Sequence, residues 1–142
     1  MSNTLDTIQA AIVTELLDAT NSTGVDAASY EDEQKMSRSG RSGGVTAYVF
    51  AEESEVDHEA NQYLMEIQTV YISLTGRNRA TLHDVAEKVK TLFYKATPLA
   101  ALVTAGADFM LFKRQSSPIG TVSGAMRVDL AFDLYYETSY TT

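Results

Sequence analysis

The chain has no cysteine and no tryptophan, and it has only two prolines and two histidines among its 142 residues. The absence of cysteine excludes disulfides, thiolate nucleophiles and the thiolate-bound classes of zinc and iron–sulfur site. Basic residues are also scarce, because eleven Lys and Arg face nineteen Asp and Glu, which gives a formal net charge of −8. Proteins that read a DNA sequence normally carry the opposite sign. The composition therefore argues against a sequence-specific DNA-binding protein.

Long hydrophobic runs are missing as well. No run approaches the roughly 18 apolar residues of a membrane span, and Met1–Thr20 lacks a basic start followed by an apolar stretch. We therefore expect neither a membrane location nor a secretion signal. Apolar and aromatic residues nevertheless make up 44% of the chain and charged residues 21%. This balance predicts a packed core in one domain spanning residues 1–142.

Two main helices are predicted from the spacing of apolar residues. Over Thr4–Ala19 these residues recur at steps of three and four, and over Leu82–Tyr94 they form the clearest stripe in the sequence. Thr81 followed by Asp84 resembles a capping box at the start of the second helix. A short helix through Leu99–Val103 is expected after it. The two stripes comprise Leu5, Ile8, Ile12 and Leu16, and Leu82, Val85, Val89, Leu92 and Phe93.

Strands are predicted where β-branched and aromatic residues alternate with other residues. The acidic segment Glu52–Glu59 is interpreted as a link between two antiparallel strands. The predicted strands are Gly44–Ala51, Tyr63–Leu74, Phe109–Lys113 and Met126–Tyr136, with a further short strand near Val25–Tyr30. Together these elements predict an α+β, two-layer sandwich. Its mostly antiparallel sheet has about four to five strands, and the two main helices pack on one face.

Residues 31–44 form a different kind of segment, rich in charged residues, serine and glycine, and we expect a flexible loop there. No Gly-Lys-Ser/Thr follows its glycines, so a phosphate-binding P-loop is not predicted. The basic residues of the loop are Lys35, Arg38 and Arg41. We expect them to pair with carboxylates of a partner or to touch nucleic-acid phosphate when the loop becomes ordered. A second, short flexible segment is expected at residues 138–142.

The sequence offers little catalytic chemistry. Glu55, Asp57, His58 and Glu59 could chelate a cation, but their spacing matches no EF-hand or zinc pattern. A solvated acidic loop is the favoured interpretation. His83 is interpreted as an exposed residue in the first turn of its helix. No nucleophile–base pair is evident, so we predict a protein that is not an enzyme and needs no cofactor or metal.

Tyrosines cluster near the end of the last strand, at Tyr135, Tyr136 and Tyr140. Tyrosine is common in interfaces because it offers a large contact area with a polar tip. An interface and a plain strand end with one buried tyrosine and a frayed terminus are both compatible with this pattern. The candidate interface residues are Lys35, Arg38, Arg41, Glu52, Glu53, Glu55, Tyr135 and Tyr140.

The order of elements over about residues 4–138 resembles the tail terminator, or tail completion, proteins of long-tailed bacteriophages and neck proteins of similar size. The resemblance includes Tyr-Leu-Met-Glu-Ile-Gln at Tyr63–Gln68, the pair Asp108-Phe109, and the ending Tyr-Tyr-Glu-Thr at Tyr135–Thr138. It rests on element order and hydrophobic pattern, since the family has no catalytic residues to transfer. The loop at Met36–Gly44 is longer and more basic than in a minimal member.

This resemblance implies a virion structural protein that assembles as a ring, typically of six copies, on the finished tail tube. The implied partners are further copies of the chain, the tail-tube protein and head–tail connector or neck proteins, with the sheath protein as an additional candidate. DNA would only pass through the lumen, and an acidic wall suits that passage. The implied location is the tail or neck of the virion, assembled in the bacterial cytoplasm.

Other functions stay open on the sequence alone. Another head–tail connector or a tail-tube component belongs to the same class, although a tube protein would usually bring a larger β-sandwich. A small ligand-binding α+β domain belongs to a different class, and it would need polar groups converging on an apolar pocket. Within a ring, the basic loop of one copy would be attracted to acidic residues of the next, such as those of Glu52–Glu59. We expect that loop to be mobile in the free subunit and ordered in the particle.

Overall fold

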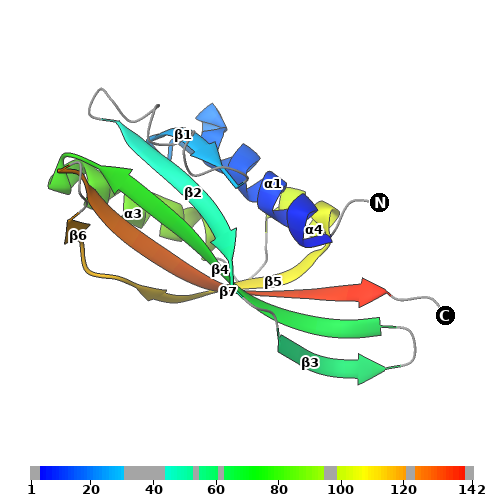
Figure 1. Cartoon of the computed structure of the whole chain (residues 1–142). Coiled ribbons are helices and arrows are strands. Elements are labelled where there is room, and N and C mark those ends of the chain that lie inside the picture. Colours follow the sequence, from blue (N-terminus) through cyan, green and yellow to red (C-terminus); the bar gives the residue numbers. More distant parts are fainter. Residues whose placement is uncertain are drawn as a thin grey trace.

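The computed structural model of the chain describes residues 4–30, 44–52, 55–60, 63–94, 99–120 and 124–139. For residue 4, for residues 55–60 and 63–66 and for residues 138–139, only the backbone is described. The described residues form helices and one mixed sheet in two layers (Figure 1).

Within this described part, the sheet has seven strands, and five of them follow the order β1-β2-β4-β7-β5. The short strands β3 and β6 add to β4 and β7 respectively. Among these strands, β1 runs parallel to its neighbour, β2, and all the other neighbouring strands pair antiparallel. The strands are β1 (Val25–Ser29), β2 (Val45–Ala51), β3 (Glu55–Ala60), β4 (Tyr63–Gly76), β5 (Ala107–Gln115), β6 (Ile119–Gly120) and β7 (Met126–Ser139).

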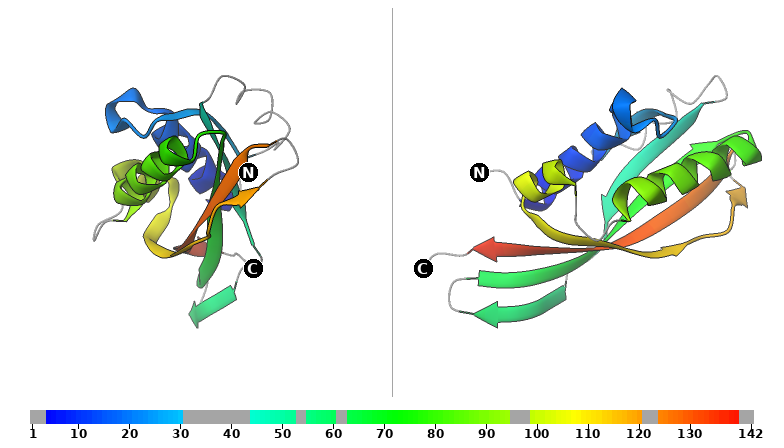
Figure 2. Two further views of the ribbon diagram at one scale, coloured as in Figure 1. Left: turned by 90° about the vertical axis from the view of Figure 1, so that its left-hand side faces the viewer. Right: turned by 180° about the vertical axis from the view of Figure 1, so that it is seen from behind.

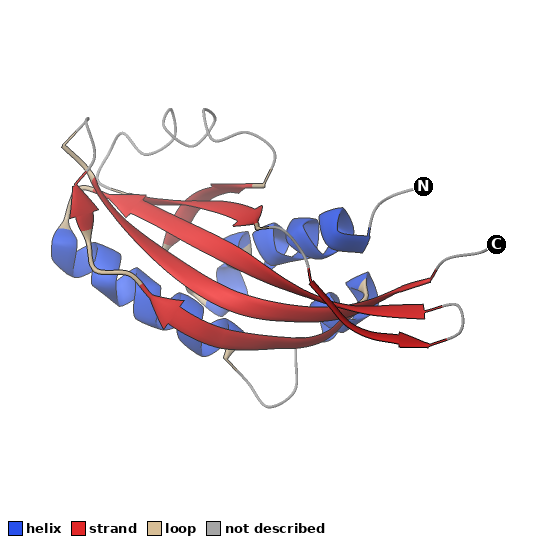
Figure 3. Ribbon diagram, turned by 60° about the horizontal axis from the view of Figure 1, so that its bottom comes forward, coloured by secondary structure: helices blue, strands red, loops and turns tan. Residues whose placement is uncertain are grey.

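The helices of the described chain lie on one side of this sheet, and Figure 3 shows the strands in front of them. They are α1 (Thr4–Leu17), the 3₁₀ turn η1 (Ala19–Asn21), α3 (Arg79–Phe93) and α4 (Ala100–Ala105). Helix α1 contacts β1, β2 and α4, while α3 contacts β2, β4, β5 and β7. The predicted α+β, two-layer arrangement is thus confirmed, with the two longest helices packed on the same sheet face.

The core lies between these layers, and it contains the residues that the hydrophobic pattern placed there. Phe132 is fully buried, and its ring meets Phe93 and Phe112 edge-on, with centroids 6.0 and 5.6 Å away. Edge-to-face packing suits the opposite partial charges of ring edge and ring face. Other fully buried residues come from α1, β4 and β7, namely Ile8, Ile12, Ile72, Leu74, Leu130 and Leu134.

The acidic segment after β2 differs from the expected link. Residues Glu55–Ala60 form β3, which pairs antiparallel with β4 through partners such as Glu59 and Leu64. Backbone hydrogen bonds of a sheet do not depend on side-chain charge, and charged residues are well tolerated on an edge strand. The composition of this segment therefore misled the interpretation, because it contains few of the residues that favour strands.

The start of α3 also differs from the prediction. The side chain of Asn78 caps this helix by accepting a hydrogen bond from the backbone N–H of Thr81, at 3.0 Å. Thr81 is therefore already inside the helix and is not its cap. Asp84 instead forms an ion pair with Lys88 one turn later, at 3.1 Å. Asparagine is at least as good an N-cap as threonine. The helix is therefore capped at Asn78, three residues before the cap that the sequence predicted.

Two glycines fix the connections between layers. Gly24 has φ +86°, and a Cβ at this position would lie 3.0 Å from Cγ2 of Val85, so the chain entering β1 approaches α3 closely. Gly106 ends α4 with φ 116°, in the left-handed region that glycine adopts without strain. Side chains at either position would strain the backbone, and at Gly24 they would also crowd α3.

One end of the sheet projects beyond the helices (Figures 1 and 2). The ladder between β4 and β7 begins at Tyr63 and Ser139, whereas β5 first pairs with β7 at Tyr136. The start of β4, the end of β7 and β3 therefore form a three-stranded extension of the two-layer body.

Candidate assembly surface

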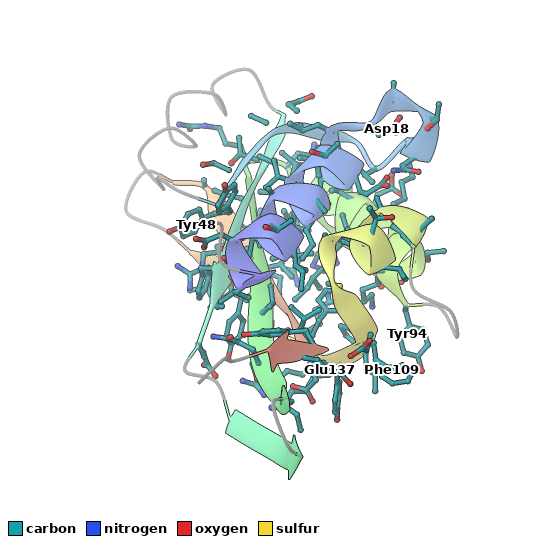
Figure 4. The ribbon with its side chains drawn as sticks, turned by 90° about the vertical axis from the view of Figure 1, so that its right-hand side faces the viewer. Asp18, Tyr48, Tyr94, Phe109 and Glu137 are labelled. Carbon is teal, nitrogen blue, oxygen red and sulfur yellow. The ribbon has the colours of Figure 1, made fainter. Side chains whose placement is uncertain are left out.

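The sheet face that points away from the helices is lined by stacked aromatic rings. Tyr48 and Phe50 of β2 stack with ring centroids 5.5 Å apart, and Phe50 stacks on Tyr71 of β4 at 5.0 Å. The register explains this, since Phe50 pairs with Tyr71 across the β2–β4 ladder. Figure 4 shows Tyr48 on the opposite side of the ribbon from Asp18 and Tyr94. We call this surface the open face.

A hydrogen-bonded group continues the open face beside these rings. The hydroxyl of Tyr71 donates to a carboxylate oxygen of Glu52 at 2.6 Å and accepts from Nη2 of Arg114 at 2.7 Å. The Arg114 guanidinium also lies 5.8 Å from the centre of the Tyr71 ring. The hydrogen bond to Glu52 raises the pKa of Tyr71 above its usual value; partial burial and the Glu52 charge act in the same direction, and Arg114 opposes them. Tyr71 thus stays protonated, and it links the acid that directly follows β2 to a base from β5.

Two further charged pairs lie on the open face. Arg127 donates to both carboxylate oxygens of Asp129, each at 2.9 Å. Lys113 lies 3.7 Å from Asp133, which also accepts a hydrogen bond from the hydroxyl of Thr69 at 3.3 Å. Bidentate pairing holds a planar guanidinium in one orientation. Because these charges are paired locally, this part of the face has little net charge to attract the phosphate backbone of a nucleic acid.

Near β5 the open face becomes apolar. Phe109 and Leu111 are 51% and 47% exposed, although both are large hydrophobic residues. Phe109 pairs with Tyr135 across the β5–β7 ladder, and their rings meet edge-on at 6.1 Å. In Figure 4, Phe109 lies near Glu137 at the margin opposite Asp18. Neighbouring exposed apolar side chains are more typical of a contact surface than isolated ones are.

The structure brings two of the sequence-predicted interface residues onto this open face. Glu52 is exposed there, although its carboxylate is engaged by Tyr71 of the same chain. Tyr135 is half-buried beside Phe109, whereas Tyr136 is buried and donates a hydrogen bond to Oε1 of Gln68 at 2.8 Å. The tyrosine pair therefore combines one buried residue with one that faces outward.

The other predicted interface residues are not placed on a surface. The predicted residues Lys35, Arg38, Arg41, Glu53 and Tyr140 lie outside the described part of the chain, as does nearly all of the Met36–Gly44 loop. Glu55 lies in β3, where only the backbone is described. Their roles in an interface stay predictions.

Sequence reasoning missed the exposure of Phe109 and Leu111. The run Phe109–Lys113 was interpreted as a short apolar strand, but β5 extends over Ala107–Gln115 and ends the main strand path. Phe109 and Leu111 alternate with the buried Met110, which is a signal for a strand with one open face. The sequence does not show which of the two faces packs against the helices.

The described residues show no catalytic or metal-binding arrangement. They contain no group of three or more His, Cys, Asp or Glu residues placed to hold a metal ion. The cation candidates Glu55, Asp57, His58 and Glu59 lie in β3, and their side chains are outside the description. His83 is half-buried, contrary to the expected exposure, and in the described part of the chain its Nε2 has no hydrogen-bond partner.

The described surface has several open hollows, of which two lie beside the features above. One of about 420 Å³ lies between η1 and α3, with Thr20, Asn21, Glu87 and Lys88 among its lining residues. The other, of about 210 Å³, lies on the open face and is lined by Tyr48, Phe50, Ser73 and Arg127. Neither lining contains a nucleophile beside a base. No helix within the described ranges is long and apolar enough to cross a membrane.

Comparison with known proteins gives a likeness in fold. No protein-family model matches the sequence, and no curated protein matches it either. The fold is similar to that of a chain in the solved structure titled "Virion of native gene transfer agent (GTA) particle". The TM-score is 0.62 at 19% sequence identity, and the match covers 92% of this chain and 94% of that chain. The two chains therefore share a fold over almost their whole lengths.

Proposed function

We propose that the protein is a structural subunit of a phage-like virion and acts as its tail terminator. The observation that carries the proposal is the nearly full-length likeness to a chain of a gene transfer agent virion. Similar fold and similar length together favour a similar kind of role, that of a small subunit in a large assembly. Among the possible positions in such a particle, we choose that of the tail terminator because the order of elements in the chain resembles that of tail terminator proteins.

The described surface supports an assembly role. A large part of the open face offers aromatic rings and exposed apolar residues, and the charges beside them are already paired within the chain. Surfaces of this composition are typical of interfaces, where aromatic residues are enriched and unpaired charges are few. In the proposed role, several copies, most simply six, form a ring that caps the tail tube and offers a surface to the neck. DNA passes through the lumen without sequence-specific contact.

Deleting the gene from the genome that encodes the particle tests this proposal. We expect filled heads and separate tails, many of them of abnormal length, because an uncapped tube is neither closed nor joined to a head. Electron microscopy of lysates would score both features, with the wild-type gene supplied in trans as the control. Normal particles from the deletion strain would contradict a virion role. Failure to make any capsid would instead indicate a head protein, and joined tails of normal length with another neck defect would indicate a connector.

A further inference from the structure

We propose that two free copies of the chain pair through their β5 strands, which lie antiparallel across a two-fold axis and join the two sheets edge to edge. The β5 edge is the outer side of β5, over residues 108–114, facing away from β7. The partner is a second copy of this chain, and the contact is centred on Leu111. This pairing goes beyond the proposed function and does not rest on it, because neighbours within a ring meet through two different surfaces and not across a two-fold axis.

The β5 edge has no strand beside it in the described part of the chain. Strand β5 pairs with β7 on one side, and no described strand pairs with its other side. Figure 3 shows β5 along one margin of the sheet. Alternate residues of an antiparallel strand direct their N–H and C=O groups to opposite sides, so the outer side of β5 offers backbone donors and acceptors. Such an edge is a template for pairing with a strand of another chain.

The other outer strands of the described sheet carry features that discourage pairing. Strand β1 has five residues and exposes Asp26, β3 is rich in acidic residues, and β6 has two residues. Short strands and charged residues are common protections of a sheet edge. Strand β5 has nine residues, and its central residues 109–112 include no charged residue and no proline. Among these strands, β5 is therefore the best suited to pairing.

Apolar side chains flank the β5 edge on both sides of the sheet. On the open face, Phe109 and Leu111 are exposed, and the Phe109 ring meets Tyr135. On the helix side, the ring of Phe112 meets Tyr94 edge-on at 6.1 Å, and Tyr94 is 64% exposed. Tyr94 and Phe109 lie at the same margin in Figure 4. A strand added to β5 would thus cover apolar surface on both sides of the new ladder, which favours association.

Two opposite charges stand near the two ends of the β5 edge. Asp108 and Arg114 are both exposed, and among the described residues neither has an ion-pair partner. Arg114 donates a hydrogen bond to the hydroxyl of Tyr71 and keeps further N–H groups available. An antiparallel pairing centred on Leu111 brings Asp108 of each copy near Arg114 of the other. The strand is therefore complementary to a second copy of itself.

The other charges near the β5 edge are compatible with this arrangement. Glu137 is exposed at the same end as Asp108, so it adds negative charge where Arg114 of the second copy arrives. Lys113 is paired with Asp133 at 3.7 Å and adds little net charge at the other end. The pairing thus needs no further charged contact.

Two bulges limit the length of the contact. The register of β5 with β7 shifts between Ala107 and Phe109, and again between Phe112 and Arg114. A bulge bends its strand and interrupts regular pairing, so the regular stretch of β5 is residues 109–112. We therefore expect a short ladder between the two copies and a reversible dimer that dissociates on dilution.

Cross-linking tests the contact directly, because the chain contains no cysteine. In Leu111→Cys the two thiols face each other across the two-fold axis, so a short bismaleimide should link this single variant into a covalent dimer. Ile119→Cys is the matched control, since Ile119 is 49% exposed but lies on β6, and it should give little dimer. No dimer from Leu111→Cys, or equal amounts from both variants, would overturn the pairing.

Sedimentation velocity over a dilution series measures the pairing without a cross-link, and thermal melting checks that each variant is folded. Asp108→Arg places two guanidinium groups together and should weaken the dimer on the order of tenfold, and adding Arg114→Asp should restore much of the loss. Asp26→Arg makes the same change on β1 and should have no effect. A monomer at every concentration up to about 1 mM, or equal losses for Asp108→Arg and Asp26→Arg, would overturn the pairing.

These outcomes are separable from those of the gene deletion. A chain that stays monomeric while the deletion strain makes unjoined tails of abnormal length would overturn the pairing and leave the proposed function standing. A dimer that cross-links through Leu111→Cys, together with normal particles from the deletion strain, would support the pairing and contradict the virion role.

Discussion

Tyr136 of β7 donates its hydroxyl hydrogen to Oε1 of Gln68 of β4, at 2.8 Å, and both side chains are buried. The register places Tyr136 opposite Glu66, so Gln68 is its diagonal neighbour on the ladder. The amide group of Gln68 also donates to the backbone oxygen of Glu52 at the end of β2. Tyr136 and Gln68 therefore join three neighbouring strands where the helix layer ends.

Removing this hydroxyl should destabilise the fold. In the Tyr136→Phe variant, Oε1 of Gln68 loses its donor in a buried place, and an unsatisfied buried polar group costs about 1–3 kcal/mol. Tyr135→Phe is the control, because Tyr135 is the adjacent residue and faces outward; its effect should stay below about 0.5 kcal/mol. Urea unfolding of both variants measures the difference. Equal free energies of unfolding would show that the Gln68 contact contributes nothing.

The apolar stripe of α3 should tolerate no charge. Val89 is fully buried between this helix and the sheet, so Val89→Asp would bury a carboxylate without a partner. We expect a loss of about 3 kcal/mol or more, which is a large share of the stability of a small domain. Thr91→Asp introduces the same group at an exposed position in the last turn of the same helix, where Glu87 and the helix dipole oppose it, and it should cost only about 1 kcal/mol or less. A wild-type melting curve for Val89→Asp would contradict the two-layer core.

The start of α3 gives a test of the cap. Asn78→Ala removes the acceptor for the Thr81 backbone N–H and should cost about 1 kcal/mol. Thr81→Ala leaves that hydrogen bond in place, because only the backbone of Thr81 takes part in it. Chemical denaturation should therefore rank Asn78→Ala well below Thr81→Ala in stability. The reverse order would restore the capping box predicted from the sequence.

The Tyr71 hydroxyl should titrate above the usual tyrosine range. Its hydrogen bond to Glu52 favours the protonated form, so the pKa is raised in the folded state. The stabilising contribution is then present below the unfolded pKa of about 10 and is lost as the pH rises through the folded pKa. A difference titration of tyrosinate absorbance between wild type and Tyr71→Phe isolates this group. Glu52→Gln should move it to lower pH, and coincident curves for Glu52→Gln and wild type would contradict the assignment.

The hydrophobic pattern of the sequence alone determined which residues of the main helices form the core. Ile8, Ile12, Leu82 and Val89 were placed on buried stripes by their spacing, and all four are buried in the structure. The α+β class followed from the order of the predicted elements, and the antiparallel pairing of β2 with β4 followed from the short segment that links them. The spacing of apolar residues predicts such elements well because a helix or strand that buries one face must place apolar residues on that face at regular intervals. This requirement is met within one segment and does not depend on its neighbours.

The tertiary structure alone decided the contacts that depend on pairing between distant segments. The acidic residues Glu55–Ala60 form a strand because β4 supplies their backbone partners, whatever the side-chain charge. Glu52 meets Tyr71, and Phe109 meets Tyr135, through register across ladders whose partners lie 19 and 26 positions apart in sequence. Register is a property of two strands together, so periodicity along one strand shows which residues share a face but not which strand lies beside them. The charge pattern and exposed residues of the open face arise from that pairing.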